Sequence, residues 1–179
     1  MFKKILIGLA VVILILVVVT ALQPADFKVE RSTTINATPA TVFGNVNDFH
    51  KWEAWSPWAK MDPAMKTTYE GPPSGTGTKY HWVGNSKVGE GQMEITDNKP
   101  AELVKIKLDF IKPVAATNDA EFAFKPEGSG TKVTWTMTGT KNFMMKGFGL
   151  VMSMDKMVGG DFEKGLAQLK AVSEAPPKP

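Results

Sequence analysis

Apolar residues fill the chain without a break from Ile5 to Leu22, behind Lys3 and Lys4, and the next charged residue is Asp26. A helix over residues 5–22 would be about 27 Å long, close to the thickness of a bilayer's hydrocarbon core. A cleaved signal peptide is the alternative, since 19–21 (Val-Thr-Ala) offers a small-residue cleavage site, but the run exceeds the usual apolar region of such peptides. The pattern favours one N-terminal transmembrane helix. Lysines before the run predict a cytoplasmic N-terminus.

After a short stalk, residues 27–35 alternate apolar and polar positions and contain many β-branched residues, which predicts a half-buried strand. Thr38 followed by Pro39 is typical of a helix start, and apolar residues at helical spacing predict a short helix over 39–49. The aromatic stretch 50–58 follows. We expect Pro57 and Pro63 to keep it out of regular structure.

From residue 65 the period becomes two, which predicts strands over 65–70, 77–84, 87–96, 101–111, 117–125 and 131–140. Glycine and proline turn signals separate them, and no helical pattern intervenes, so the six should form an antiparallel meander. Helical spacing returns at 158–172, where Gly159-Gly160 either interrupts the last helix or marks its start. This order predicts an α+β domain over 26–174, between an anchor and stalk (1–25) and a flexible tail (175–179).

Charge and composition exclude several classes of function. The chain has 21 Lys+Arg against 18 Asp+Glu, and without Lys3 and Lys4 the remainder is nearly neutral. Arg31 is the only arginine, so we expect no nucleic-acid partner. The absence of cysteine excludes thiol catalysis, disulfides and thiolate metal sites.

Residues for catalysis or metal binding are few. The two histidines, His50 and His81, lie far apart in sequence without a third spaced ligand, so we expect no metal site, and His81 is a weak candidate for a general base. Strand alternation turns the acids on the predicted strands away from the core: Glu90, Glu94, Asp109, Asp119 and Glu121. A catalytic carboxylate is then possible only at an irregular position such as a bulge, or at the rim, where Glu53 or Asp62 could reach. We assign no catalytic residue and no cofactor.

Aromatic and methionine side chains are abundant, and these types form cores but also line pockets for apolar ligands. Of the ten methionines, five cluster within Met144–Met157, between the last strand and the final helix. We expect this stretch and the segment 55–58 to form the rim through which a ligand enters. The candidate cavity lining is Trp55, Trp58, Tyr80, Trp82, Met93, Phe110, Phe122, Trp135, Met137, Met157 and Phe162.

The order of elements, together with several local motifs, resembles the START and polyketide-cyclase-like superfamily (SRPBCC), and within it the bacterial polyketide cyclase or dehydrase proteins with an N-terminal anchor. The motifs lie at 29–43 (VERSTTINATPATVF), 52–58 (WEAWSPW) with Asp62-Pro63, 75–85, 89–91, 130–135 (GTKVTW) and 161–170 (DFEKGLAQLK). The resemblance implies a helix-grip fold, in which a curved seven-stranded antiparallel sheet wraps a long C-terminal helix around a hydrophobic cavity.

Relatives in this superfamily include lipid carriers, hormone-binding proteins and cyclase enzymes, and no catalytic motif of theirs transfers residue by residue onto this sequence. We therefore expect a non-enzymatic, membrane-anchored domain that binds or transports a lipid or hydrophobic small molecule on the outer side of a bacterial cytoplasmic membrane. One alternative is an enzyme acting on a polyketide-like or lipidic substrate. Another is a structural or sensory envelope protein whose cavity is filled by side chains.

Overall fold

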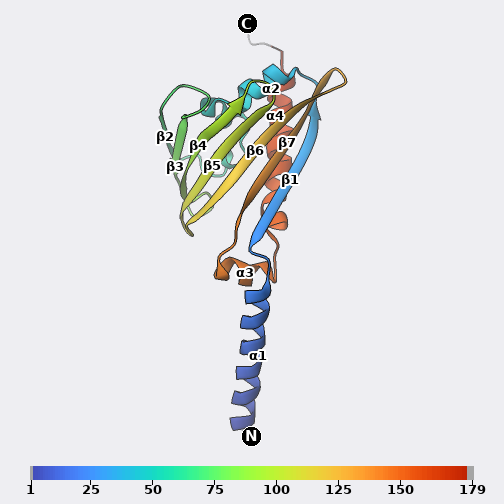
Figure 1. Cartoon of the computed structure of the whole chain (residues 1–179). Helices are drawn as coiled ribbons and strands as arrows, with labels where there is room; N and C mark the ends of the chain where they lie inside the picture. Colours follow the sequence, from blue (N-terminus) through green and yellow to red (C-terminus); the bar gives the residue numbers. More distant parts are fainter. Residues whose placement is uncertain (1, 177–179) are drawn as a thin grey trace.

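The computed structural model describes residues 2–176 and has one helix that projects below a single sheet (Figure 1). This helix, α1 (Phe2–Leu22), projects from the domain and is the one helix within residues 2–176 that is long and apolar enough to cross a membrane. An N-terminal signal sequence satisfies the same criteria of length and composition. The expected tail at 175–179 lies outside the described residues from 177 onward.

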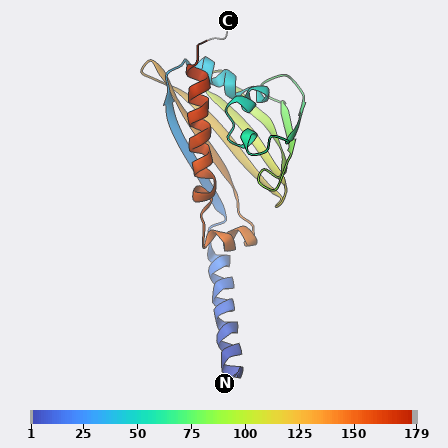
Figure 2. The same ribbon diagram turned by 180° about the vertical axis from the view of Figure 1, so that it is seen from behind.

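All seven strands form one antiparallel sheet in the order β1-β7-β6-β5-β4-β3-β2. The long helix α4 (Met154–Glu174) crosses the concave face, as Figure 2 shows. The predicted helix-grip architecture is therefore confirmed. The strands are β1 (Asp26–Ile35), β2 (Lys66–Glu70), β3 (Lys79–Val83), β4 (Glu90–Lys99), β5 (Leu103–Lys112), β6 (Ala116–Glu127) and β7 (Gly130–Thr140).

Each strand lies within a few residues of its predicted range, because alternation marks the face that packs on α4. On β7, for example, Val133, Trp135 and Met137 are buried while the residues between them face outward. The first and last strands of the chain pair with each other, with Asp26 opposite Thr140. The stalk and the end of β7 consequently meet at one corner of the sheet.

The short helix is α2 (Pro39–Val46), capped by Thr38, whose side chain accepts a hydrogen bond from the Thr41 amide. It ends earlier than predicted because Asp48 caps a new turn, η1 (Phe49–Ala54), by accepting from the His50 amide at 3.0 Å. A second turn, η2 (Trp58–Lys60), follows Pro57. The aromatic stretch thus contains two 3₁₀ turns where we expected irregular chain.

Two features near the C-terminus differ from the prediction. Residues Phe143–Gly149 form a helix, α3, capped by the Asn142 side chain, which accepts from the Met145 amide at 2.9 Å. The helix α4 begins earlier than expected, after Ser153, and runs through Gly159-Gly160. The sequence gives no clear helical pattern for the first residues of α4, because the glycines and methionines in this part of the chain weaken the apolar periodicity.

Arg31 of β1 explains why residue 159, near the start of α4, is a glycine. Its guanidinium bonds Asp155 at 2.7 Å and Glu163 at 2.7 Å, and so bridges two turns of the helix from β1. A Cβ on Gly159 would collide with that guanidinium. The glycine therefore allows the arginine to lie flat against the helix between its two partners.

Removal of residues 1–24 should leave a folded domain, because the buried apolar cluster contains no residue of α1. The truncated chain is expected to keep the far-UV circular dichroism of the sheet and a cooperative melt near that of the full chain in mild detergent. Loss of cooperative melting would contradict this and would give α1 a role in the core.

Candidate functional site

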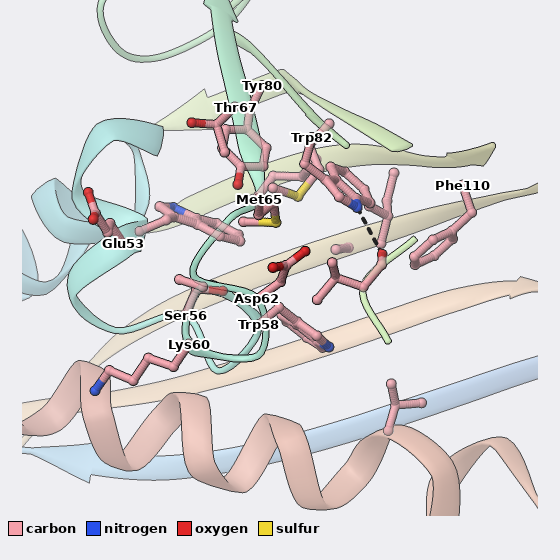
Figure 3. Close-up of a pocket in the computed structure, with 18 of the residues that line it drawn as sticks. Glu53, Ser56, Trp58, Lys60, Asp62, Met65, Thr67, Tyr80, Trp82 and Phe110 are labelled. Atoms are coloured by element: carbon pink, nitrogen blue, oxygen red, sulfur yellow. Dashed lines mark hydrogen bonds between the residues drawn. The ribbon is translucent and has the colours of Figure 1, made fainter. Parts of the chain in front are cut away.

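A partly open cavity of about 810 Å³ lies between the first half of α4 and the concave face of the sheet. Strands β2 to β7 supply one wall, and the segment from Trp52 to Met65 covers the opening (Figure 3). The residues between β3 and β4, including Lys87 and Val88, complete it. The cavity is therefore built where the long helix does not cover the sheet.

One end of the cavity is closed by stacked aromatic rings. Trp135 of β7 stacks on Phe162 of α4 with ring centroids 4.0 Å apart and planes at 8°. Phe122 stacks on the other side of Trp135 at 4.7 Å, and Trp58 meets the Trp135 ring edge-on at 5.8 Å. These contacts join the helix, the sheet and the loop segment at a single point.

The opposite wall is made by aromatic residues of β3 and β5. Trp82 stacks on Tyr80 at 5.9 Å, meets Phe110 edge-on, and donates from Nε1 to the Val88 carbonyl at 3.0 Å, the dashed line in Figure 3. Its partner across the strands is Gly91, next to a bulge in β4. A Cβ on Gly91 would collide with the indole, so this glycine makes room for the ring.

Most of the candidate lining residues are brought together in the cavity wall: Trp58, Tyr80, Trp82, Met93, Phe110, Trp135, Met137, Met157 and Phe162. Trp55 and Phe122 are not part of the wall. Trp55 turns inward after η1, where it is fully buried and donates from Nε1 to the Asn45 carbonyl at 3.0 Å. Phe122 lies behind Trp135, which separates it from the cavity.

The expected rim is only partly present. Ser56 and Trp58 line the cavity, as do Met154 and Met157 in the first turns of α4. The methionines at 144, 145 and 152 lie outside the cavity wall, and Met144 instead lines a groove between α3 and α1. The methionine-rich stretch thus divides into a cavity-lining part and a separate apolar surface.

The polar residues of the cavity have distinct roles. Asp62 is buried, with Oδ1 accepting from the Ala64 amide at 3.0 Å and Oδ2 from the Asn85 amide at 2.7 Å, so it ties the covering segment to the residues after β3. Glu53, Lys60 and Lys87 are exposed. Burial, with smaller contributions from Tyr69 and Glu53, raises the pKa of Tyr80 to about 12. Its hydroxyl therefore stays protonated and can donate a hydrogen bond to a ligand.

Neither histidine lines the cavity among the described residues. His81 lies on the strand between the inward-facing Tyr80 and Trp82, with Nε2 4.0 Å from a Glu90 carboxylate oxygen. His50 stacks on Tyr69 at 4.1 Å. Residues 2–176 also contain no cluster of three or more ligand groups that could hold a metal ion.

Several wall residues were absent from the candidate list, including Trp52, Met65, Val88, Ile106, Leu108 and Ala120. Alternation on β5 and β6 could have identified the last three, since they share a face with Phe110 and Phe122. The loop residues carry no periodic signal, so only the folded chain identifies them.

The family model described as polyketide cyclase / dehydrase and lipid transport matches residues 26–174. The chain belongs to this family. No curated protein matches the sequence. Members of the polyketide cyclase / dehydrase and lipid transport family thus share the part of the chain that forms the sheet, α4 and the cavity, whereas α1 lies before the matched region.

Solved structures with the same fold have low sequence identity to this chain. Protein CV1439 from Chromobacterium violaceum is 12% identical with a TM-score of 0.62, covering 83% of this chain and 98% of its own. Ms6760 from Mycobacterium smegmatis is 16% identical with a TM-score of 0.56, covering 81% of this chain and 89% of its own. Ara h 8.0201 is 13% identical with a TM-score of 0.56, covering 83% of this chain and 97% of its own. At such identities the likeness shows the fold alone.

Replacement of Trp135 by alanine should lower the free energy of unfolding by about 3–5 kcal/mol, because its ring is packed between Phe162 and Phe122. Both indoles border the cavity, but Trp82→Ala should cost less, since Trp82 stacks on one ring, Tyr80, whereas Trp135 stacks on two. Urea unfolding of both variants tests this order. Equal losses would indicate that the Trp82 wall is packed as tightly as the core.

Acid should weaken the attachment of α4 to β1. Hydrogen bonds from Arg31 hold the pKa of Asp155 in the folded protein below its usual value. The pair therefore stabilises the fold fully at pH values above about 3.9, the pKa of an aspartate in the unfolded chain. This contribution is lost as the pH falls through the lower pKa of the folded state. Asp155→Asn should therefore lower Tm at neutral pH, and its difference from the unchanged protein should shrink below about pH 4. Asp161→Asn is the matched control, because Asp161 pairs with Lys164 of the same helix. A Tm difference independent of pH would contradict this role of Asp155.

Proposed function

We propose that this protein is a membrane-anchored, non-enzymatic carrier or binding domain for a lipid or another hydrophobic small molecule. The observation that supports this most directly is the cavity of about 810 Å³, lined mainly by aromatic, aliphatic and methionine side chains. Ligand pockets typically span roughly 300–1,000 Å³ and combine an apolar wall with a few polar groups. The family description, which includes lipid transport, agrees with this reading.

The cavity walls suit an elongated apolar ligand with a polar end. Met93, Met137 and Met157 give the wall adaptable shape, because an unbranched thioether chain changes rotamer easily. The hydroxyl of the half-buried Tyr80 offers one donor, and the exposed Glu53, Lys60 and Lys87 lie where a polar group would meet solvent. A ligand could thus bury its apolar part against the sheet and leave its polar end near the covering segment.

The anchor supports a role next to a membrane. In this proposal α1 stays attached and spans a bacterial cytoplasmic membrane once, with Lys3 and Lys4 on the cytoplasmic side and the domain outside. Tethering raises the local concentration of the binding domain next to a supply of lipid.

An enzymatic role is the second candidate, favoured by the cyclase / dehydrase part of the family description and by Glu53 in the cavity wall. Asp62 is a poor acid or base, since both of its oxygens already accept backbone hydrogen bonds. His81 is not part of the cavity wall, and its Nε2 lies 4.0 Å from a Glu90 carboxylate oxygen instead. Recovery of a chemically altered ligand would favour the enzyme.

Filling the cavity should abolish lipid binding without unfolding the protein. Ala120 lies in the cavity wall, and Ala120→Phe would place a ring inside it, whereas Ala123→Phe, on the other face of the same strand, is the matched control. With the full chain in nanodiscs of brominated phospholipid, a bound lipid would quench cavity tryptophans such as Trp58, Trp82 and Trp135. We expect the tryptophan fluorescence to be quenched in the unchanged protein and in Ala123→Phe. In Ala120→Phe this quenching should be lost. Equal quenching in both variants would contradict binding in this cavity.

A further inference from the structure

A second apolar surface lies outside the cavity, on α3 and the turn that follows it. Phe148 is 68% exposed and Val151 88% exposed, and large apolar neighbours are exposed beside them. A contiguous exposed patch of this kind marks an interaction site in most proteins. We define the α3 patch by its most exposed members, Phe143, Met144, Phe148, Val151 and Met152.

Helix α3, which carries most of this patch, lies directly beside the end of α1 (Figure 1, Figure 2). Gly147 covers Thr20, which is buried although it belongs to an otherwise exposed helix, and the Lys146 ammonium lies 3.5 Å from the Ala21 carbonyl. Side chains of α3 and α1 together line a shallow groove: Ile13, Leu16, Val17, Thr20, Phe143, Met144, Phe148 and Val151. The α3 patch is therefore level with the last turns of α1.

The height along α1 at which α3 contacts it indicates what covers the α3 patch. From Thr20, which Gly147 covers, to the end of α1 at Leu22 the helix rises about 3 Å, and from Ile13 at the far end of the groove it rises about 14 Å. Interfacial amphipathic helices bury their apolar face about 5–10 Å into the boundary between headgroups and acyl chains. If α1 spans a bilayer, the contact between the α3 patch and α1 begins at that boundary and extends to the acyl chains below it.

The charges around the patch fit an anionic lipid surface. Residues 141–154 include two lysines, Lys141 and Lys146, and no acidic residue. Lysine near a leaflet is attracted to anionic headgroups, and its long side chain can reach them while its stem remains among apolar groups. Apolar and basic residues thus occur together where α1 leaves the bilayer.

We propose that α3 and residues 150–152 are a membrane-docking surface that lies in the lipid interface on the side where α1 ends. This inference rests on the proposed anchor. Helix α4 starts directly after this surface, and Met154 and Met157 of its first turn line the cavity. This part of the cavity wall would therefore lie next to the membrane leaflet. The cavity would then receive its ligand from the membrane itself, which narrows the ligand class to bilayer lipids and amphiphiles dissolved among them.

Single cysteines can test this in the full chain, because the sequence contains no cysteine. An environment-sensitive fluorophore is attached at Val151→Cys, with Phe148→Cys as a second position, and the protein is reconstituted in phosphatidylcholine/phosphatidylglycerol vesicles. Nitroxide attached to lipid acyl chains and iodide in the water then quench the fluorophore from opposite sides. Val17→Cys reports the anchor, and Ala167→Cys, on the exposed side of α4, is the aqueous control.

Both docking positions should be quenched several-fold more by the nitroxide lipid than Ala167→Cys, and should be shielded from iodide. Quenching by iodide at Val151 and Phe148, with Val17 still quenched by lipid, would overturn the docking surface and leave the anchor intact. Iodide quenching at Val17 as well would overturn the anchor. Shielding of both docking positions from iodide and from nitroxide would mean that a protein covers the patch, and would also overturn the proposal.

Discussion

The stacking of Trp135 on Phe162 is the contact on which the arrangement of helix and sheet depends. At 4.0 Å between ring centroids, it sets how closely α4 approaches β7. Gly165 allows this approach, since a Cβ there would lie 2.8 Å from the Trp135 ring. Rings fill the space behind the stack, where Trp55 and Phe122 are buried. On the other side, the sheet continues beyond the reach of α4, and the cavity occupies that space.

A second contact, between Arg31 and α4, determines the direction in which the helix runs from the Trp135–Phe162 stack. Arg31 binds Asp155 and Glu163 from β1, so it holds the first half of the helix over the edge of the sheet and away from β3 and β4. Exposed ion pairs contribute little stability, whereas a stacked aromatic pair contributes about 0.5–1.5 kcal/mol beyond the area it buries. The aromatic contact therefore supplies the larger share of the stability, and the ion pairs of Arg31 add a smaller share and fix the direction of α4.

Periodicity predicted the strands, the order of elements and the inward face of each strand, because burial on one side of a sheet leaves an alternating pattern in the sequence. Most cavity-lining residues of β3 to β7 follow from the same pattern. It could not separate Phe122 from Trp135, since both point inward and only their order of stacking decides which one borders the cavity. It also missed α3, where a short segment rich in glycine and methionine has no clear helical face and is held by its Asn142 cap and by contact with α1.

The sheet register, rather than a flexible linker, determines where the domain lies relative to α1. The first strand follows α1 after a stalk of only Gln23, Pro24 and Ala25, and it pairs with β7, which leads into α3. Asp26 lies opposite Thr140, and the Lys141 amide donates to the Ala25 carbonyl at 2.8 Å, so the stalk is held in the same ladder. Any chain with this register must bring the end of α1 and the start of α3 to one corner of the sheet. The position of the cavity relative to α1 is consequently a property of the fold, because the same register that joins β1 to β7 also sets where α4 and the sheet enclose it.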